Sequence, residues 1–162
     1  MPPQLPSSRV DQLGFLVPDL AEGVREWTAA LDAPQWRIYS YSPGKAGAHY
    51  GYRGRPGQFA MRLALADTVP QIELIEPIAG PSIYHDWIAE HGYGLHHVGF
   101  FVSSVADIVD DYRAHGLEPA QTGAGYGVDG DGGFAYYERQ HVLGAVVEFI
   151  EIPARRVPSE IL

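Results

Sequence analysis

Two short phrases of this chain each occur twice, in the same order, and they place four potential metal ligands at paired positions. The phrase QLGFLV, which begins at Gln12, returns as HVGFFV beginning at His97. The phrase IELIEP around Glu73 returns as VEFIEIP around Glu148. One amide, one imidazole and two carboxylates are donors that bind divalent cations. A cation held in this way can polarise a carbonyl group and stabilise the charge that develops when a neighbouring C–H bond loses its proton.

The alternation of side chains along strands allows these four residues to converge. In a strand, residues i and i+2 face the same side, and each candidate lies in an apolar stretch that is typical of a strand. A carboxylate on the inner face of a sheet is unfavourable unless it is paired or bound to a cation. Two carboxylates at equivalent positions, Glu73 and Glu148, therefore favour one shared metal ion. The alternative for both is an exposed position, and Gln12 is informative only through its equivalence to His97.

Three neighbours of the candidate ligands are assigned other roles by the same alternation. His96 precedes His97 and is expected on the opposite face of the strand, as a packing residue with its hydrogen bonds satisfied. Glu76 and Glu151 alternate away from the ligands or lie at strand ends, so surface roles are expected for both.

The first half of the chain is predicted to contain the elements that carry Gln12 and Glu73. Its order is strand, helix, strand, strand, strand, over residues 10–17, 20–31, 36–41, 59–66 and 69–76. The helix has an amphipathic face at spacings of four, three and four, and Asp19 is placed to cap it. Five glycines and two prolines predict a long loop over residues 42–57.

The second half repeats this plan after a connector, residues 78–94, that contains a short helix. Strands are predicted at residues 95–102, 117–122, 134–138 and 145–152, with a helix at 104–115 and a glycine-rich turn at 123–133. The polar tail, residues 154–162, is expected to be mobile. The whole chain, residues 1–162, is thus predicted as a single α+β domain of two tandem βαβββ modules, over residues 8–77 and 95–153.

Composition excludes several classes of protein. Apolar residues make up 46% of the chain and the formal net charge is −9, which argues against a nucleic-acid partner. No apolar run is long enough to span a membrane, and the start lacks the regions of a signal peptide, so a cytoplasmic location is expected. The absence of cysteine excludes disulfides and thiolate ligands.

The duplicated pattern, over residues 10–153, resembles the vicinal oxygen chelate superfamily. That superfamily includes glyoxalase I, methylmalonyl-CoA epimerase, extradiol dioxygenases and bleomycin-resistance proteins. The resemblance implies an open eight-stranded, barrel-like sheet around one divalent metal ion (Zn, Ni, Co, Mn or Mg). The ligands that it implies are Gln12, Glu73, His97 and Glu148. Their order is similar to that of animal-type glyoxalase I, whereas the connector region more closely resembles methylmalonyl-CoA epimerase.

The implied activity is that of a metal-dependent lyase or isomerase, which abstracts a proton next to a metal-bound carbonyl or thioester and forms an enolate. Glu148 is the expected main base and Glu73 the second. Extradiol dioxygenases hold iron with two histidines and one carboxylate, and only one histidine, His97, is among the four positions. Oxygenase chemistry is therefore disfavoured. One alternative is a non-catalytic protein that binds a small molecule or sequesters an antibiotic. A second is an enzyme of secondary metabolism that uses the same site on a polyketide-like ligand.

The chain departs from both of the closer relatives. Leu16 stands where glyoxalase I has an arginine for the glutathione carboxylate. No glutamate occurs between Glu26 and Glu73, where the epimerase has a further catalytic one. The sequence therefore leaves both glutathione and coenzyme A open as parts of the substrate.

A small-molecule substrate is the expected partner, and several arginine and tyrosine side chains are candidates for binding it. The loop at residues 42–57 is a candidate lid. Trp27 and Trp87 on predicted helices could contribute to a homodimer interface. The candidate substrate-binding residues are Arg37, Tyr39, Tyr52, Arg53, Arg62 and Tyr136.

Overall fold

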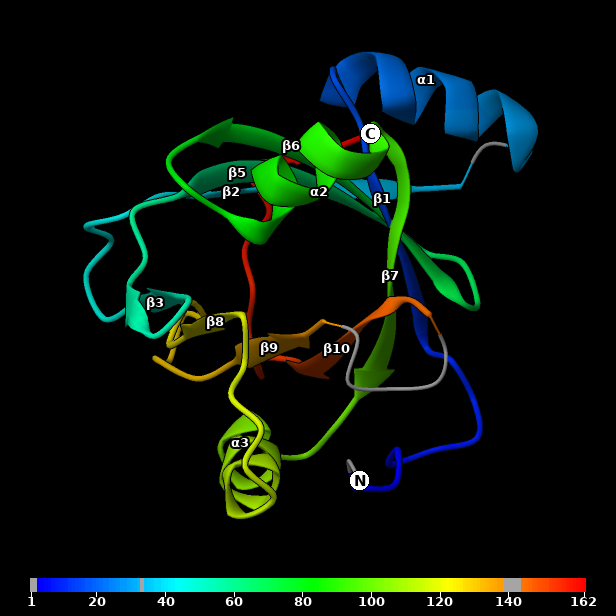
Figure 1. Ribbon diagram of the computed structural model, residues 1–162. Coiled ribbons are helices and arrows are strands. Elements are labelled where there is room, and N and C mark those ends of the chain that lie inside the picture. Colours follow the sequence, from blue (N-terminus) through cyan, green and yellow to red (C-terminus); the bar gives the residue numbers. More distant parts are fainter. Residues whose placement is uncertain (1–2, 33, 139–143) are drawn as a thin grey trace.

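A single β-sheet curls into an open ring, with the first and the last helix of the chain outside it (Figure 1). The computed structural model describes residues 3–32, 34–138 and 144–162. The first half forms β1 (Gln12–Leu16), α1 (Leu20–Ala30), β2 (Trp36–Tyr41), β5 (Ala60–Ala66) and β6 (Gln71–Ala79). The second half forms β7 (Gly94–Phe101), α3 (Val105–Ala114), β8 (Gln121–Ala124), β9 (Gly133–Tyr137) and β10 (Val146–Glu151). The predicted α+β fold of two βαβββ modules is confirmed.

The order of the strands shows the duplication directly. Within the described part of the chain it is β11-β2-β5-β6-β1-β7-β10-β9-β8-β3-β4. Each module contributes four consecutive strands, and the two sets join where β1 and β7 pair antiparallel. On either side of this seam β1 pairs parallel with β6, and β7 pairs parallel with β10. The eight predicted strands are therefore the central eight, and further short strands extend the sheet at both ends.

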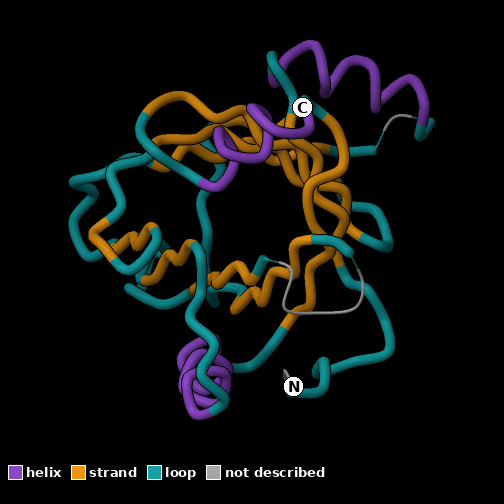
Figure 2. Tube along the Cα trace, in the orientation of Figure 1, coloured by secondary structure: helices purple, strands orange, loops and turns teal. Residues whose placement is uncertain are grey.

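The three helices of the described residues occupy different positions on the sheet. Helix α1 contacts β5 and β6, whereas α3 contacts β9 and β10, and Figure 2 shows both outside the ring. Helix α2 (Ile83–His91) connects the modules, and its residues Ile83 and Tyr84 pack in the inner core. None of these helices is long and apolar enough to cross a membrane.

Apolar packing divides into an inner core and two outer ones. The inner core fills the ring and includes Leu16, Tyr84 and Tyr136. One outer core lies between α1 and the sheet and the other between α3 and the sheet. Trp27 packs against the first outer core and Trp87 against the inner one. Both tryptophans thus contact their own chain, and the homodimer stays a prediction.

Two segments that were expected to be irregular form strands. The expected long loop at residues 42–57 contains β3 (His49–Tyr52) and β4 (Arg55–Pro56), and β3 pairs with β8. Tyr50 and Tyr52 pack against the inner core, which explains why this glycine-rich segment is extended. The prediction of a mobile tail is also wrong, because β11 (Glu160–Ile161) pairs with β2.

The strand expected at residues 117–122 begins only at Gln121. Pro119 has no backbone N–H to donate to a ladder, and the first bond to β9 is donated by the next residue, Ala120, to the backbone oxygen of Tyr136 at 2.8 Å.

Each outer helix is capped by its own module in the same way. Asp19 accepts a hydrogen bond from Glu22 N at 2.8 Å, as predicted for an N-cap. In addition, Glu76 Oε2 accepts from Leu20 N at 3.1 Å. At the repeat-equivalent position, Glu151 Oε2 accepts from Val105 N at 3.0 Å, at the start of α3. The expected surface roles of Glu76 and Glu151 are therefore corrected: both bind a helix N-terminus, where a negative charge is stabilising.

Candidate metal centre

The seam between the modules brings the four candidate ligands together. In the antiparallel register of β1 and β7, Gln12 is opposite Gly99 and Gly14 is opposite His97. Strands β6 and β10 flank this pair and carry Glu73 and Glu148. All four side chains are buried inside the ring, with exposed fractions between 0% and 6%. Each module thus supplies two of the four donors.

His97 Nε2 lies at the centre of the group. Its distance is 3.0 Å to Glu148 Oε2, 3.2 Å to Glu73 Oε2 and 3.3 Å to Gln12 Oε1. The two carboxylate atoms lack hydrogen-bond geometry with any of the described residues. One imidazole N–H cannot serve three oxygen atoms at once. The oxygen atoms therefore surround a position that favours a positive charge.

The charges of the group depend on one another. Burial alone would lower the pKa of His97, but the carboxylates of Glu148 and Glu73 raise it to about 9. Burial raises the pKa of Glu148, and His97 opposes that shift. Without a cation, the favoured arrangement is thus a protonated imidazole between two acids.

These residues fit a divalent cation. Glu73, His97 and Glu148 each offer a ligand atom, and the three atoms lie within 4.8 Å of one another. A cation would bind both carboxylate oxygens at once, which the single Nε2–H of His97 cannot do, and buried oxygens without a hydrogen bond are unfavourable. His97 Nδ1 lies 3.0 Å from His96 Nδ1, so a proton shared there would leave Nε2 free to bind a metal.

His96 differs from its expected role because of a β-bulge. The register of β1 and β7 shifts between Gly14 and Phe15, so that His97 and then Leu95 face β1, and His96 is left without a partner residue. The bulge turns His96 into the inner core, where its ring lies 5.2 Å from that of Trp87. His96 Nε2 is buried without a hydrogen bond to the described residues. The expectation of a satisfied side chain on the opposite face is therefore wrong.

A small cavity of about 70 Å³ opens beside the ligand group. Tyr136 lines it, and its ring lies 5.2 Å from the ring of His97. Tyr84 also lines the cavity and donates a hydrogen bond to the Tyr136 hydroxyl at 3.0 Å. Apolar side chains of β5 form another wall.

The structure places two further substrate-binding candidates on β2. Arg37 shares a face of the strand with Tyr39, but its backbone lies between Leu65 of β5 and Ile161 of β11, and it does not line the cavity. The Tyr39 ring is buried beneath the guanidinium of Arg156 at 4.0 Å, next to the cavity.

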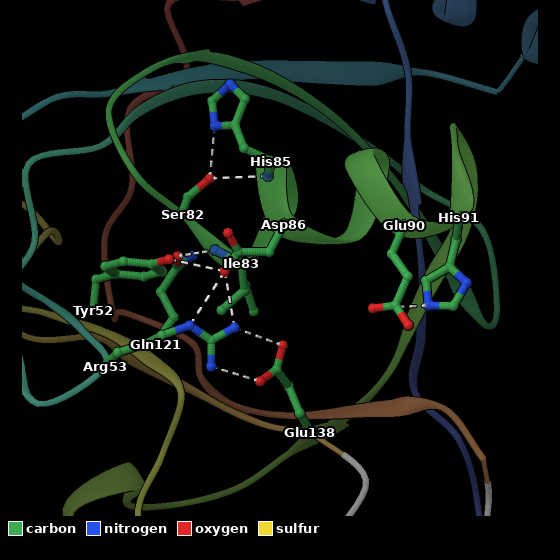
Figure 3. A network of polar contacts seen from close by, with 10 residues as sticks. All are labelled: Tyr52, Arg53, Ser82, Ile83, His85, Asp86, Glu90, His91, Gln121 and Glu138. Carbon is green, nitrogen blue, oxygen red and sulfur yellow. Dashed lines mark hydrogen bonds and ion pairs between the residues drawn. The ribbon is translucent and has the colours of Figure 1, made fainter.

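The remaining three candidates lie elsewhere. Arg53 bonds to Asp86 Oδ2 at 2.8 Å and to Glu138 Oε2 at 2.9 Å, and Tyr52 also donates to Asp86, in the network drawn in Figure 3. This network joins the hairpin of β3 and β4 to α2 and to the end of β9. Arg62 is exposed and lies 3.7 Å from Glu76, outside the ring. None of the three lines the cavity.

One cavity residue has no sequence signal. Arg156 belongs to the tail after β10, yet its side chain lines the same cavity as Glu73 and Glu148. Nothing in the pattern of residues 154–162 distinguishes Arg156 from its neighbour Arg155. Only the path of the tail back to β2 brings Arg156 to the cavity.

The chain matches the model of a known family. Residues 11–137 match the family model described as the Glyoxalase/Bleomycin resistance protein/Dioxygenase superfamily. A search of curated proteins gave no match.

Several solved structures share the fold. A methylmalonyl-CoA epimerase of Streptomyces coelicolor, in complex with 2-nitronate-propionyl-CoA, is 20% identical with a TM-score of 0.58, and the match covers 93% of this chain and 98% of that one. The methylmalonyl-CoA epimerase of Mycobacterium tuberculosis is 18% identical with a TM-score of 0.58, and the match covers 91% of this chain and 89% of that one. A hypothetical protein of Bacillus halodurans C-125 is 19% identical with a TM-score of 0.57, and the match covers 93% of this chain and 99% of that one. Identities this low show a common fold.

Proposed function

Because the chain belongs to the glyoxalase/bleomycin resistance protein/dioxygenase superfamily, we propose that it is a metal-dependent lyase or isomerase. The proposed reaction removes a proton from the carbon next to a carbonyl or thioester group. One observation carries this proposal: three buried oxygen atoms, from Gln12, Glu73 and Glu148, surround His97 Nε2 at 3.0–3.3 Å. Burying these polar and charged groups in an apolar interior is unfavourable unless they bind a cation.

The residues that would hold the cation are Gln12, Glu73, His97 and Glu148. When bound, a divalent cation supplies Lewis acidity, which polarises a carbonyl and stabilises the charge that develops on its oxygen. The protein contributes position: two donors come from each module, and the strand pairing of the seam fixes their spacing.

Glu148 is the proposed main base. Its carboxylate lines the cavity, and burial raises its pKa, which makes the carboxylate a stronger proton acceptor than an exposed one. Glu73 lines the same cavity from the other module and is the proposed second base. Tyr84, Tyr136 and the apolar wall of β5 also line the cavity, and the electrostatic interactions of buried charges are stronger in such surroundings than in water.

The proposal does not include glutathione. Leu16, at the position of the glutathione-binding arginine of glyoxalase I, is 1% exposed and packs in the inner core. Nor does the chain have the additional glutamate of the epimerase between Glu26 and Glu73. The proposed substrate is therefore defined by its reacting carbonyl or thioester group, and no carrier group is assigned to it.

Two measurements together test the function. Metal analysis after dialysis is expected to find about one divalent ion per chain. In D₂O, a panel of short carbonyl acids and thioesters is expected to contain at least one compound that exchanges its α-proton, and Glu148→Gln is expected to abolish that exchange. A protein that retains no ion and exchanges no proton would instead favour the non-catalytic, ligand-binding alternative.

A further inference from the structure

The C-terminal tail crosses the ring from one module to the other. It leaves β10 in the second module and ends as β11, which pairs with β2 of the first module. Figure 1 shows this red segment running from the side of β9 and β10 to the side of β2 and β5. On the way, Ala154 N donates to Asp131 Oδ2 at 2.7 Å, and Val128 N donates to the backbone oxygen of Arg155. The tail is therefore held at both ends.

Between these two attachments, Arg156 turns its side chain into the cavity. Its guanidinium carbon lies 4.0 Å from the centre of the Tyr39 ring and 5.3 Å from that of Tyr126. Arg156 Nε donates to the Tyr41 hydroxyl at 2.8 Å, and Nη2 donates to the same oxygen. Three tyrosines thus hold the cation by its face and by one edge.

No carboxylate of the described residues forms an ion pair with Arg156. Burial raises the pKa of Tyr41 to about 12, so that hydroxyl stays neutral and does not act as a counter-ion. A guanidinium has five N–H donors, and the contacts with Tyr41 use two of them. A part-buried cation with free donors and no acid paired with it favours an anionic ligand.

We propose that Arg156 binds a carboxylate of the substrate and so determines its class: a short acid whose carbonyl group reaches the ligand group at Glu73 and Glu148. The inference rests on the proposed function for the role of the carbonyl. Arg156, Glu73 and Glu148 line the same cavity, so one short ligand placed there would lie between the guanidinium and the two carboxylates. The planar fork of arginine matches a carboxylate with two parallel hydrogen bonds.

The test uses malonate as the probe and malonamide as its neutral counterpart, titrated into the full chain by calorimetry, both metal-free and loaded with Zn²⁺. The unmodified protein is expected to bind malonate in preference to malonamide. Arg156→Gln is expected to weaken malonate binding about tenfold to a hundredfold, the range for hydrogen bonds to a charged group, with the affinity for Zn²⁺ unchanged. Arg156→Lys keeps the charge without the fork and is expected to lose less.

Arg155→Gln is the matched control, because Arg155 lies one residue away and bonds to Asp129 outside the cavity, at 2.8 Å. Equal affinities of Arg156→Gln, Arg156→Lys and the unmodified protein for malonate would overturn the proposal, as would an equal loss in Arg155→Gln. If Arg156→Gln does not fold, Arg156→Lys alone decides. The titration of the metal-free protein reports on Arg156 separately, whereas absence of bound metal and of proton exchange would count against the proposed function.

Discussion

Gly14 lies directly beneath the imidazole of His97, so that a Cβ at position 14 would be 1.9 Å from His97 Cε1. At the equivalent position of the second module, a Cβ on Gly99 would lie 3.0 Å from Gln12 Cβ. The glycine of each repeated phrase therefore makes room for the first ligand of the other phrase. The two halves depend on each other at the atoms that form the candidate metal centre.

The two glycines give a graded prediction. Gly14→Ala is expected to displace His97, because 1.9 Å is far below a van der Waals contact, and to weaken metal binding about tenfold to a hundredfold. The crowding is also expected to destabilise the fold by about 1–3 kcal/mol. Gly99→Ala, whose added Cβ would lie 3.0 Å from Gln12 Cβ, is expected to lose less metal affinity and less stability. Metal titration and thermal melting of the two variants check the order; a greater loss in Gly99→Ala would contradict it.

Metal removal is expected to lower thermal stability. A ligand that binds only the folded state at a hundred times its Kd stabilises that state by about 2.7 kcal/mol. For a chain of this size that corresponds to a Tm higher by roughly 5–10 °C. Thermal melting with added Zn²⁺ and with chelator measures this difference in Tm. In Glu73→Gln and Glu148→Gln the difference is expected to be small. A Tm that does not respond to metal in the unmodified protein would argue against the centre.

Metal binding is expected to release about one proton below pH 9. The carboxylates raise the pKa of His97 to about 9 against the effect of burial, so at neutral pH a metal must displace the proton on Nε2. Metal affinity should rise about tenfold per pH unit up to about pH 9 and then level off. Calorimetry in buffers of different ionisation enthalpy measures the released proton. A pH-independent affinity would contradict the assignment of His97.

The metal-free protein is expected to respond to pH in the opposite direction. Because the folded state raises the pKa of His97 from 6.5 to about 9, its stabilisation is complete below about pH 6.5 and is lost as the pH rises through 9. The raised pKa of Glu148 acts in the same direction. Denaturant unfolding of chelated protein at several pH values should therefore show falling stability, and a rise would contradict this charge arrangement.

The two helix-capping glutamates give a prediction away from the site. Glu76→Gln and Glu151→Gln remove the charge at the start of α1 and α3 and are each expected to reduce stability by about 1 kcal/mol. The double variant should lose about the sum, because the two residues share no partner. Metal affinity is the control measurement and should not change. A selective loss of metal binding would mean that these residues influence the centre.

The sequence predicts the ligand strands well because their signal is local. Alternation fixes the face of Glu73 within β6, and duplication identifies Glu148 as its counterpart. His96 could not be placed correctly, since its orientation depends on a bulge between strands far apart in the sequence. Arg156 was missed for a similar reason: its side chain is polar and its segment irregular, and only the pairing of β11 with β2 brings it inward.

The seam between β1 and β7 also has a mechanical consequence. A cation held by two donors from each module would cross-link the two modules across the ring. Separating the modules to admit a bulky compound would remove ligands from the ion. The same cross-link would therefore both retain the metal and restrict the size of the compounds that reach it.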